Sequence, residues 1–284
     1  PLIILILVTG IFLTVRLGLL QVRYLGKALK FMVKNEEDGH GEVTSFGALC
    51  TALSATIGTG NIVGVATAIS AGGPGALFWM WVAAFFGMAT KYAEGFLAVR
   101  YRTIDEEGHV LGGPFYYIEN GMGHKWKWLA KVFSFFGACV GLFGIGTFTQ
   151  VNGIASAVQS FFDPNKEDTV SILGTDYSIA IVITAFALAI CVGLVVIGGI
   201  KRISSVSQVI VPFMAILYIV TVLVLIVTNI EKLPGALATI VEYAFGVKAV
   251  AGGVLSSIAI SMQKGIARGI FSNEAGLGSA PIAA

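Results

Sequence analysis

The sequence predicts an all-α fold, a polytopic bundle of membrane-spanning helices. Of its 284 residues, 56% are hydrophobic and only 12% are charged, whereas a soluble globular domain carries about 25% charged residues. The apolar residues gather in several stretches of about 18 or more, which is long enough to cross a bilayer. Only helices satisfy their own backbone groups over such a length in lipid. The basic residues form no single stripe, so we expect a lipid bilayer and no nucleic acid as partner.

Seven spans can be placed, and each is interpreted as one helix unless its sequence breaks it. They cover approximately residues 2–20, 45–72, 76–100, 129–162, 179–200, 206–228 and 250–271. The first stretch has neither a basic leader nor a cleavage site, so it is predicted to be a span and not a signal peptide. Between spans six and seven, residues 233–247 are predicted to form a short helix on the outer face. The chain starts at Pro1 and stops at Ala284 in small-residue sequence, so we expect a fragment of a longer protein.

Orientation follows from the Lys and Arg residues in the connections, which are enriched on the cytoplasmic side. With the N-terminus outside, the inner connections hold 13 such residues and the outer connections hold 3. The inner set is Arg23, Lys27, Lys30, Lys34, Arg100, Arg102, Lys125, Lys127, Lys131, Lys201, Arg202, Lys264 and Arg268, and the outer set is Lys166, Lys232 and Lys248. This asymmetry predicts a multi-pass protein of the plasma or inner membrane with its N-terminus outside.

The second span contains the run Ser54-Ala55-Thr56-Ile57-Gly58-Thr59-Gly60-Asn61-Ile62-Val63-Gly64. Two glycines one residue apart are poor helix material, since each costs about 1 kcal/mol relative to Ala in a helix interior. Backbone groups freed at this depth are costly unless they line a cavity and bind an ion or solute. The run therefore predicts an unwound segment with a binding function. The alternative is a packing seam, because Gly60 and Gly64 also fit the small-residue spacing of close helix contacts.

The seventh span carries a second irregular stretch, residues 256–265, in a helix of opposite direction. Two interrupted helices in corresponding positions of inverted halves indicate a shared site near the midplane. Ser261, Met262 and Gln263 are the candidate substrate contacts there.

The fourth span combines glycines at helical spacing with polar residues. Gly137, Gly141 and Gly144 are interpreted as packing surface. Phe148 and Gln150 follow as candidate substrate contacts, and Gln150 is favoured over Asn152 as the polar group that faces a solute. None of the spans carries a His–carboxylate pair, a nucleophile beside a base, or a Cys/His metal spacing, so we expect no enzyme activity and no resident cofactor.

Three runs resemble the alanine or glycine:cation symporter family. They are residues 55–61; Gly72-Gly73-Pro74-Gly75-Ala76-Leu77-Phe78-Trp79-Met80-Trp81; and Arg268-Gly269-Ile270-Phe271-Ser272-Asn273-Glu274-Ala275-Gly276-Leu277-Gly278-Ser279-Ala280-Pro281. The resemblance covers the whole chain. It implies a fold similar to the leucine transporter, with two inverted five-helix repeats. On that pattern residues 1–284 form one incomplete transmembrane domain, with a peripheral helix at 1–25, the first repeat at 44–228 and the start of the second at 236–284.

The resemblance also implies site residues and a function. Amides of Gly58, Thr59 and Gly60 would hold a substrate carboxylate. The Thr56 carbonyl and the Asn61 side chain would bind one sodium ion, and the carbonyls of Ser54 and Ile57 would face a second. The implied function is sodium-coupled symport of small neutral amino acids, alanine and glycine, by alternating access. A related carrier for another small solute, or one driven by protons, shares these features. A seven-span receptor or retinal protein is the third alternative, because its N-terminus is also outside.

Overall fold

A computed structural model describes residues 2–33, 43–144, 146–172, 174–246 and 254–282. Most of these residues are helical, as the fold prediction required. The apolar helices are α1 (Leu2–Arg16), α4 (Ser45–Thr56), α5 (Val63–Gly72), α6 (Gly75–Arg100), α8 (Lys127–Leu142), α9 (Thr147–Phe162), α10 (Ile179–Val196), α11 (Gly199–Thr228) and α13 (Val254–Asn273). Lys34, Lys248 and residues 250–253 of the predicted seventh span lie outside the described residues.

Shorter elements connect these helices. They are α2 (Leu20–Arg23), α3 (Leu25–Val33), α7 (Pro114–Met122), α12 (Leu233–Ala244), and the 3-10 turns η1 (Thr59–Asn61), η2 (His124–Trp126), η3 (Ile230–Lys232) and η4 (Ala280–Ile282). Two antiparallel hairpins join β1 (Thr103–Ile104) to β2 (Val110–Leu111) and β3 (Thr169–Ile172) to β4 (Thr175–Ser178). The prediction of a short helix after residue 233 is confirmed by α12.

Several helices have the length and composition of membrane spans. Three stretches of the described chain qualify by themselves: Ile179–Val196, Gly199–Thr228, and His124–Phe162 if it is counted across the junction between α8 and α9. The bent pair α4–α5 would be a fourth if it counts as one span. The 26 residues of α6 and the 20 residues of α13 correspond to about 39 and 30 Å of helix. These apolar helices are compatible with a helical membrane protein.

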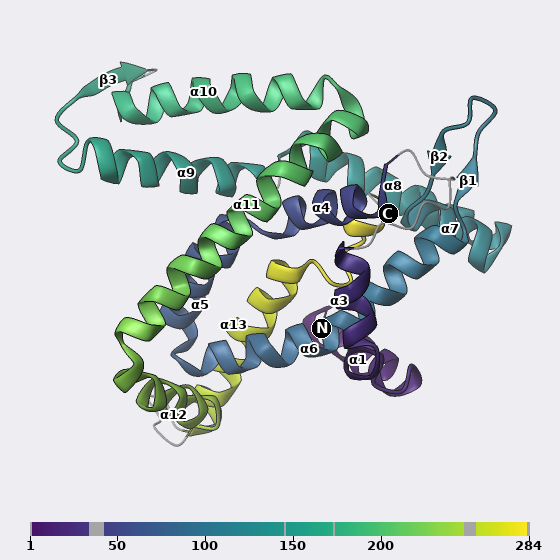
Figure 1. Ribbon diagram of the computed structural model, residues 1–284, viewed down its shortest axis with the longest axis horizontal. Helices are drawn as coiled ribbons and strands as arrows, with labels where there is room; N and C mark the ends of the chain where they lie inside the picture. The colour runs from purple at the N-terminus through teal and green to yellow at the C-terminus, as the bar shows by residue number, and fades with distance from the viewer. Residues whose placement is uncertain (1, 34–42, 145, 173, 247–253, 283–284) are drawn as a thin grey trace.

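Helix α13 forms the centre of the packed region. It runs beside α6 and α5 in Figure 1, where α13 is yellow. Its Gly265 and Gly269 face α6, because a Cβ on Gly265 would lie 2.3 Å from the Ala76 carbonyl oxygen and one on Gly269 would lie 2.9 Å from Ala83 Cβ. This four-residue spacing lets the two backbones approach closely. The buried cluster of Ala83, Ile266 and Ile270 fills the same contact.

The segment after α13 folds back onto the end of α6. The backbone N–H of Gly278 donates to the buried carboxylate of Glu94 at 3.1 Å, and Lys91 donates to the Glu274 carbonyl at 3.5 Å. The Ser279 hydroxyl donates to the Glu274 carboxylate. On neighbouring α7, burial and then the nearby Glu94 charge raise the pKa of Tyr117 to about 12. Lys91 and Glu94 thus hold the chain after α13 against α6.

The fourth predicted span is not one helix. It is divided into α8 and α9, because Gly144 (φ +59) and Gly146 (φ +92) adopt backbone conformations that a helix does not use. The expected packing role of its other glycines is also not seen: a Cβ on Gly137 or Gly141 would meet nothing within 4 Å. The connection between α9 and α10 contains the β3–β4 hairpin.

From residue 254 onward, where the structure describes it, the seventh predicted span is an uninterrupted helix although the sequence indicated a break. Residues 256–265 all lie within α13. The physical reason is composition: this stretch has serines, which remain compatible with a helix, but Gly265 is its one glycine. The paired glycines that break the second span are absent from it.

We expect Gly265→Ala to lower the stability of the protein. The added methyl would meet the Ala76 carbonyl oxygen at 2.3 Å, and overpacking of this kind costs about 1–3 kcal/mol. Thermal unfolding of the full-length protein in detergent would show a lowered midpoint. Gly137→Ala is the control, since its methyl meets nothing within 4 Å and alanine favours helix by up to about 1 kcal/mol. Equal midpoints for the two variants would contradict the packing argument.

Candidate functional site

The second span is broken where the sequence predicted. Helix α4 ends at Thr56, and Ile57 (φ −95, ψ 111) and Gly58 (φ −159, ψ −163) are extended. The single turn η1 follows, and α5 starts at Val63. The two helices are bent by 61° at this point. We call residues 57–62 the break.

Glycine is needed at position 58 for space and not for its backbone angles. Any residue can adopt the extended conformation of Gly58. However, a Cβ there would lie 2.5 Å from Nε2 and 2.6 Å from Oε1 of Gln150. The missing side chain therefore lets the carboxamide of Gln150 lie directly against the backbone of the break.

The Gln150 carboxamide oxygen bonds to Thr59 twice. The Thr59 backbone N–H donates to Oε1 at 2.7 Å, and the Thr59 hydroxyl donates to it at 2.6 Å. Because both partners are donors, Oε1 is the acceptor end, and the Nε2 donors remain beside Gly58. Of the two polar residues in the fourth span, Gln150 reaches the break, while Asn152 is exposed.

Helix α9 starts in the right place to deliver Gln150. The turn at Gly144 and Gly146 precedes α9, so Gln150 falls in its first helical turn. One turn later, Gly153 leaves room for the Thr59 side chain, whose Cγ2 would lie 3.0 Å from a Cβ on Gly153. The glycines before and after Gln150 thus set both the direction of α9 and its close approach to the break.

Several backbone groups of the break have no protein partner. The Asn61 N–H donates to the Gly58 carbonyl at 3.0 Å, and the Ile62 N–H donates to the Thr59 carbonyl at 3.2 Å. The amides of Gly58 and Gly60 have no acceptor within the described residues. The carbonyls of Ser54, Thr56 and Ile57 accept no backbone hydrogen bond there either. Donors and acceptors are thus exposed a few residues apart, an arrangement that suits an anionic group and a cationic group together.

The Gly60 carbonyl has a different partner, a guanidinium from α13. Arg268 Nη2 donates to it at 2.5 Å. A Cβ on Gly64 would lie 1.3 Å from the same Nη2 and 1.8 Å from Cζ, so the guanidinium occupies the notch that Gly64 leaves. The seam that Gly60 and Gly64 were alternatively expected to form thus receives an arginine side chain and not another helix backbone.

The predicted cation ligands lie just before the break and within it. The Thr56 hydroxyl donates to the backbone carbonyls of Ala52 at 3.1 Å and Leu53 at 3.3 Å. The Ser54 hydroxyl donates to the backbone carbonyl of Thr51 at 2.7 Å. These bonds leave the carbonyls of Ser54, Thr56 and Ile57 as the oxygens available there. The Asn61 side chain is half-buried at the end of η1.

The predicted contacts on α13 do not meet the break. Ser261 is 1% exposed, whereas Met262 and Gln263 are exposed. The residue of α13 that reaches the break is Arg268, about 10 Å farther along the helix axis from Ser261. Phe148 is also displaced: its ring lies against Gly144 and is 72% exposed.

Arg268 is the site residue that the sequence reasoning missed. It was counted among inner-connection charges together with Lys264, but both lie within α13. Lys264 Cβ would be 2.9 Å from a Cβ on Gly72, at the C-terminal end of α5. The signal was present, because Arg268 falls inside the predicted span 250–271 and charges within spans are functional candidates.

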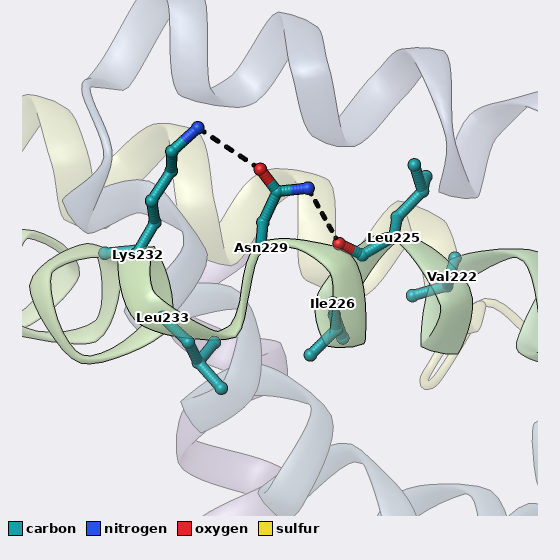
Figure 2. A pocket seen from close by; sticks show the side chains of 7 residues that line it. Val222, Leu225, Ile226, Asn229, Lys232 and Leu233 are labelled. Atoms are coloured by element: carbon teal, nitrogen blue, oxygen red, sulfur yellow. Dashed lines mark hydrogen bonds between the residues drawn. The ribbon is translucent and has the colours of Figure 1, made fainter.

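A separate hollow lies at the corner between α11 and α12. It measures about 230 Å³ and is lined by Val222, Leu225, Ile226, Asn229, Lys232, Leu233 and Ala236. Figure 2 shows that Lys232 donates to Asn229, which donates to the Leu225 carbonyl. Its polar groups are satisfied by each other, so this hollow offers fewer free binding groups than the break.

Comparison with known proteins also indicates a transporter. The profile of the sodium:alanine symporter family matches residues 1–284. The chain is 55% identical to an uncharacterized transporter of Haemophilus influenzae over 285 positions, which cover 100% of this chain and 59% of that protein. It is 49% identical to the sodium/alanine symporter AgcS of Methanococcus maripaludis, covering 99% and 59%. It is 41% identical to the amino-acid carrier protein AlsT of Bacillus subtilis, covering 97% and 54%. The chain thus spans somewhat more than half the length of these relatives.

We expect Gly58→Ala to destabilise the protein through Gln150 alone. The new methyl would lie 2.5 Å from the carboxamide nitrogen, so the Gln150 side chain must move away from Thr59, and each hydrogen bond lost costs about 0.5–1.5 kcal/mol. In the double variant Gly58→Ala/Gln150→Ala the overlap disappears, so part of this loss should be recovered. Thermal midpoints of the four proteins in the cycle measure the coupling. Strictly additive effects would show that Gln150 does not lie against Gly58.

Proposed function

Because this chain belongs to the sodium:alanine symporter family, we propose that the protein is a secondary active transporter that carries small neutral amino acids, alanine and glycine, together with sodium ions. Family members are transporters and not enzymes, and this excludes the seven-span receptor or retinal protein. The observation that carries the proposal is the break itself. Its free amides and free carbonyls lie a few residues apart in a helix of a membrane protein.

The anionic end of the substrate would bind at the amides. The N–H groups of Gly58 and Gly60 have no protein acceptor among the described residues. The turn η1 begins within the break, and α5 begins directly after it. The N-terminal end of a helix carries a partial positive charge and favours an anion. The Thr59 amide, which was also predicted to hold the carboxylate, donates to Gln150 Oε1 instead. This bond leaves Nε2 of Gln150 as a third donor for the carboxylate beside Gly58 and Gly60. Ser261, Met262, Gln263 and Phe148 remain proposed contacts for the rest of the substrate.

Sodium would bind at the carbonyls. It is a hard cation that prefers oxygen ligands, and uncharged oxygens can supply them without a buried carboxylate. We propose the Thr56 carbonyl and the Asn61 side chain for one ion, and the carbonyls of Ser54 and Ile57 for a second. The Thr56 carbonyl accepts no backbone hydrogen bond within the described residues, so coordination would replace a bond that the break has removed.

Transport would proceed by alternating access in a leucine-transporter-like architecture. Residues 44–228 would form the first five-helix repeat and residues 236–284 the start of the second, with residues 1–25 peripheral. The N-terminus would lie outside the cell membrane. Removing Lys264 and Arg268 from the inner charge count leaves the asymmetry in the same direction.

The sodium gradient is sufficient for the proposed work. One charge moved across 100 mV is worth about 2.3 kcal/mol, and a tenfold concentration ratio adds about 1.4 kcal/mol. Together they support accumulation of a neutral amino acid on the order of several hundred-fold. A proton-driven carrier for another small solute is the alternative.

Replacing sodium by choline separates these alternatives. We expect uptake of radiolabelled alanine by cells that express the full-length protein to fall to the background of empty-vector cells, because the coupling ion is missing. Excess glycine should compete with the label, whereas lysine should not. Alanine uptake that persists in choline and rises at low external pH would instead support the proton-driven carrier.

Substitution of Gln150 by Glu tests the carboxylate site. Glutamate keeps an acceptor for Thr59 but replaces the Nε2 donor by a negative charge, which would repel the substrate carboxylate. We expect alanine affinity to fall by at least about tenfold, since a hydrogen bond to a charged group is worth about 1.5–3 kcal/mol. Asn152→Asp is the matched control, with the same chemical change on an exposed position of α9. An unchanged KM in Gln150→Glu would remove Gln150 from the site.

A further inference from the structure

Helix α13 contributes a cation to the break that the proposed mechanism has not used. Arg268 Nη2 donates to the Gly60 carbonyl at 2.5 Å, and its Cζ lies 5.3 Å from the centre of the Phe271 ring. Its Nε is buried and has no hydrogen-bond partner among the described residues. Within that part of the chain, no carboxylate forms an ion pair with it. The guanidinium is therefore held by one carbonyl, one aromatic face and one notch.

The guanidinium occupies the space that a side chain at position 64 would need. A methyl on Gly64 would lie 1.3 Å from Nη2, 1.8 Å from Cζ and 2.1 Å from Nε, so any other residue at position 64 requires the guanidinium to move. By comparison, a methyl on Gly60 would lie 3.2 Å from Nη2, which is a much milder contact. The Arg268 side chain of α13 thus fits the space left by the missing side chain of Gly64 on α5, and these two helices pack together.

The carbonyl that Arg268 binds is one that the break has released. In a regular helix the Gly60 carbonyl would accept from the N–H four residues later, and no such bond is formed here. A carbonyl left free in lipid costs several kcal/mol. A guanidinium is suited to replace the lost donor, because it stays charged and presents several N–H groups in a fixed plane.

We propose that Arg268 is a positioning residue of the substrate site: by binding the Gly60 carbonyl it fixes the peptide group between Gly60 and Asn61 and so restrains the backbone at Gly60, whose own N–H is proposed to bind the substrate. This inference rests on the proposed function for its consequence in binding, but the contact itself can be tested without transport. Arg268 lies against the face of the break that carries Gly60, and Gln150 against the backbone at Gly58. The broken segment is therefore held by two side chains from two different helices, α9 and α13.

The contact can be removed from either side. Arg268→Ala deletes the guanidinium, and Gly64→Ala displaces it while leaving the arginine in the protein. Two controls match these changes: Lys264→Ala removes an exposed cation from the same helix, and Gly95→Ala adds a methyl that meets nothing within 4 Å. The double variant Arg268→Ala/Gly64→Ala fills the notch with a methyl and no longer contains the overlap.

Hydrogen–deuterium exchange of the full-length protein in detergent measures whether the contact between Arg268 and Gly60 protects the break. We expect exchange in the peptide that covers residues 56–64 to rise at least severalfold in Arg268→Ala and Gly64→Ala, and to stay at the wild-type rate in both controls. This readout does not depend on alanine or sodium. If exchange in residues 56–64 is unchanged in both single variants, Arg268 does not hold the break and the inference is overturned.

Alanine binding to the same purified proteins tests the consequence. We expect the Kd for alanine to rise at least about tenfold in both single variants, with Arg268→Lys recovering part of the affinity because it restores a cationic donor. Should exchange rise while alanine affinity stays at the wild-type value, the contact would be structural and the positioning role would be lost. Should the wild-type protein bind no alanine while exchange still responds, the proposed substrate would be wrong and the role of Arg268 at the break would stand.

If Arg268→Ala does not accumulate in membranes, exchange and alanine binding are measured on Gly64→Ala and Arg268→Met instead. Methionine keeps apolar volume in the notch but has no hydrogen-bond donor. Higher thermal stability of the double variant than of Gly64→Ala alone is the expected sign of the steric coupling. Additive stability losses would contradict the placement of the guanidinium against Gly64.

Discussion

Backbone hydrogen bonding inside the bilayer is the constraint on which this structure depends. A helix that crosses lipid can release its peptide groups only where other groups of the protein, or a bound solute, replace the lost bonds. At residues 57–62 the replacement is partial: Gln150 takes the Thr59 donors and Arg268 takes the Gly60 carbonyl. The amides of Gly58 and Gly60 and the carbonyls before them are left without partners in the described part of the chain. These remaining groups are the ones that the proposed substrate and sodium ions would bind.

The glycines of the chain perform different physical tasks. Gly265 and Gly269 let α13 lie against α6, so that the position of α13 is fixed along its length. Gly144 and Gly146 turn the chain between α8 and α9 through positive φ angles. Gly58 and Gly64 provide space for Gln150 and Arg268, respectively. Close helix packing therefore brings the two side chains to the break, and the glycines of the broken helix admit them.

The proposed symport follows from the signs of the groups that remain. Amide donors at the start of η1 and α5 favour an anion, and the carbonyls at the end of α4 favour a cation. A zwitterionic amino acid with a sodium ion supplies both charges without adding net charge other than that of the ion. In the interrupted helix, backbone donors and backbone acceptors would together meet both requirements.

The sequence by itself determined the helical class, the family likeness and the location of the break, because these depend on local composition. Long apolar stretches require helices, and the Gly58-Thr59-Gly60 run is intrinsically poor at forming one. It also indicated Gln150 as the polar residue of its helix most suited to face a solute. The interpretation of local composition was wrong in two places: residues 256–265 form a regular helix, and the long stretch before Phe162 is divided in two at Gly144 and Gly146. Only the tertiary structure showed that Arg268 reaches the break, because nothing in the sequence states that position 268 of one helix lies against the notch at Gly64 of another. That pairing is set by the close packing of α13 on α5 and α6, a property of three helices together and not of any one of them.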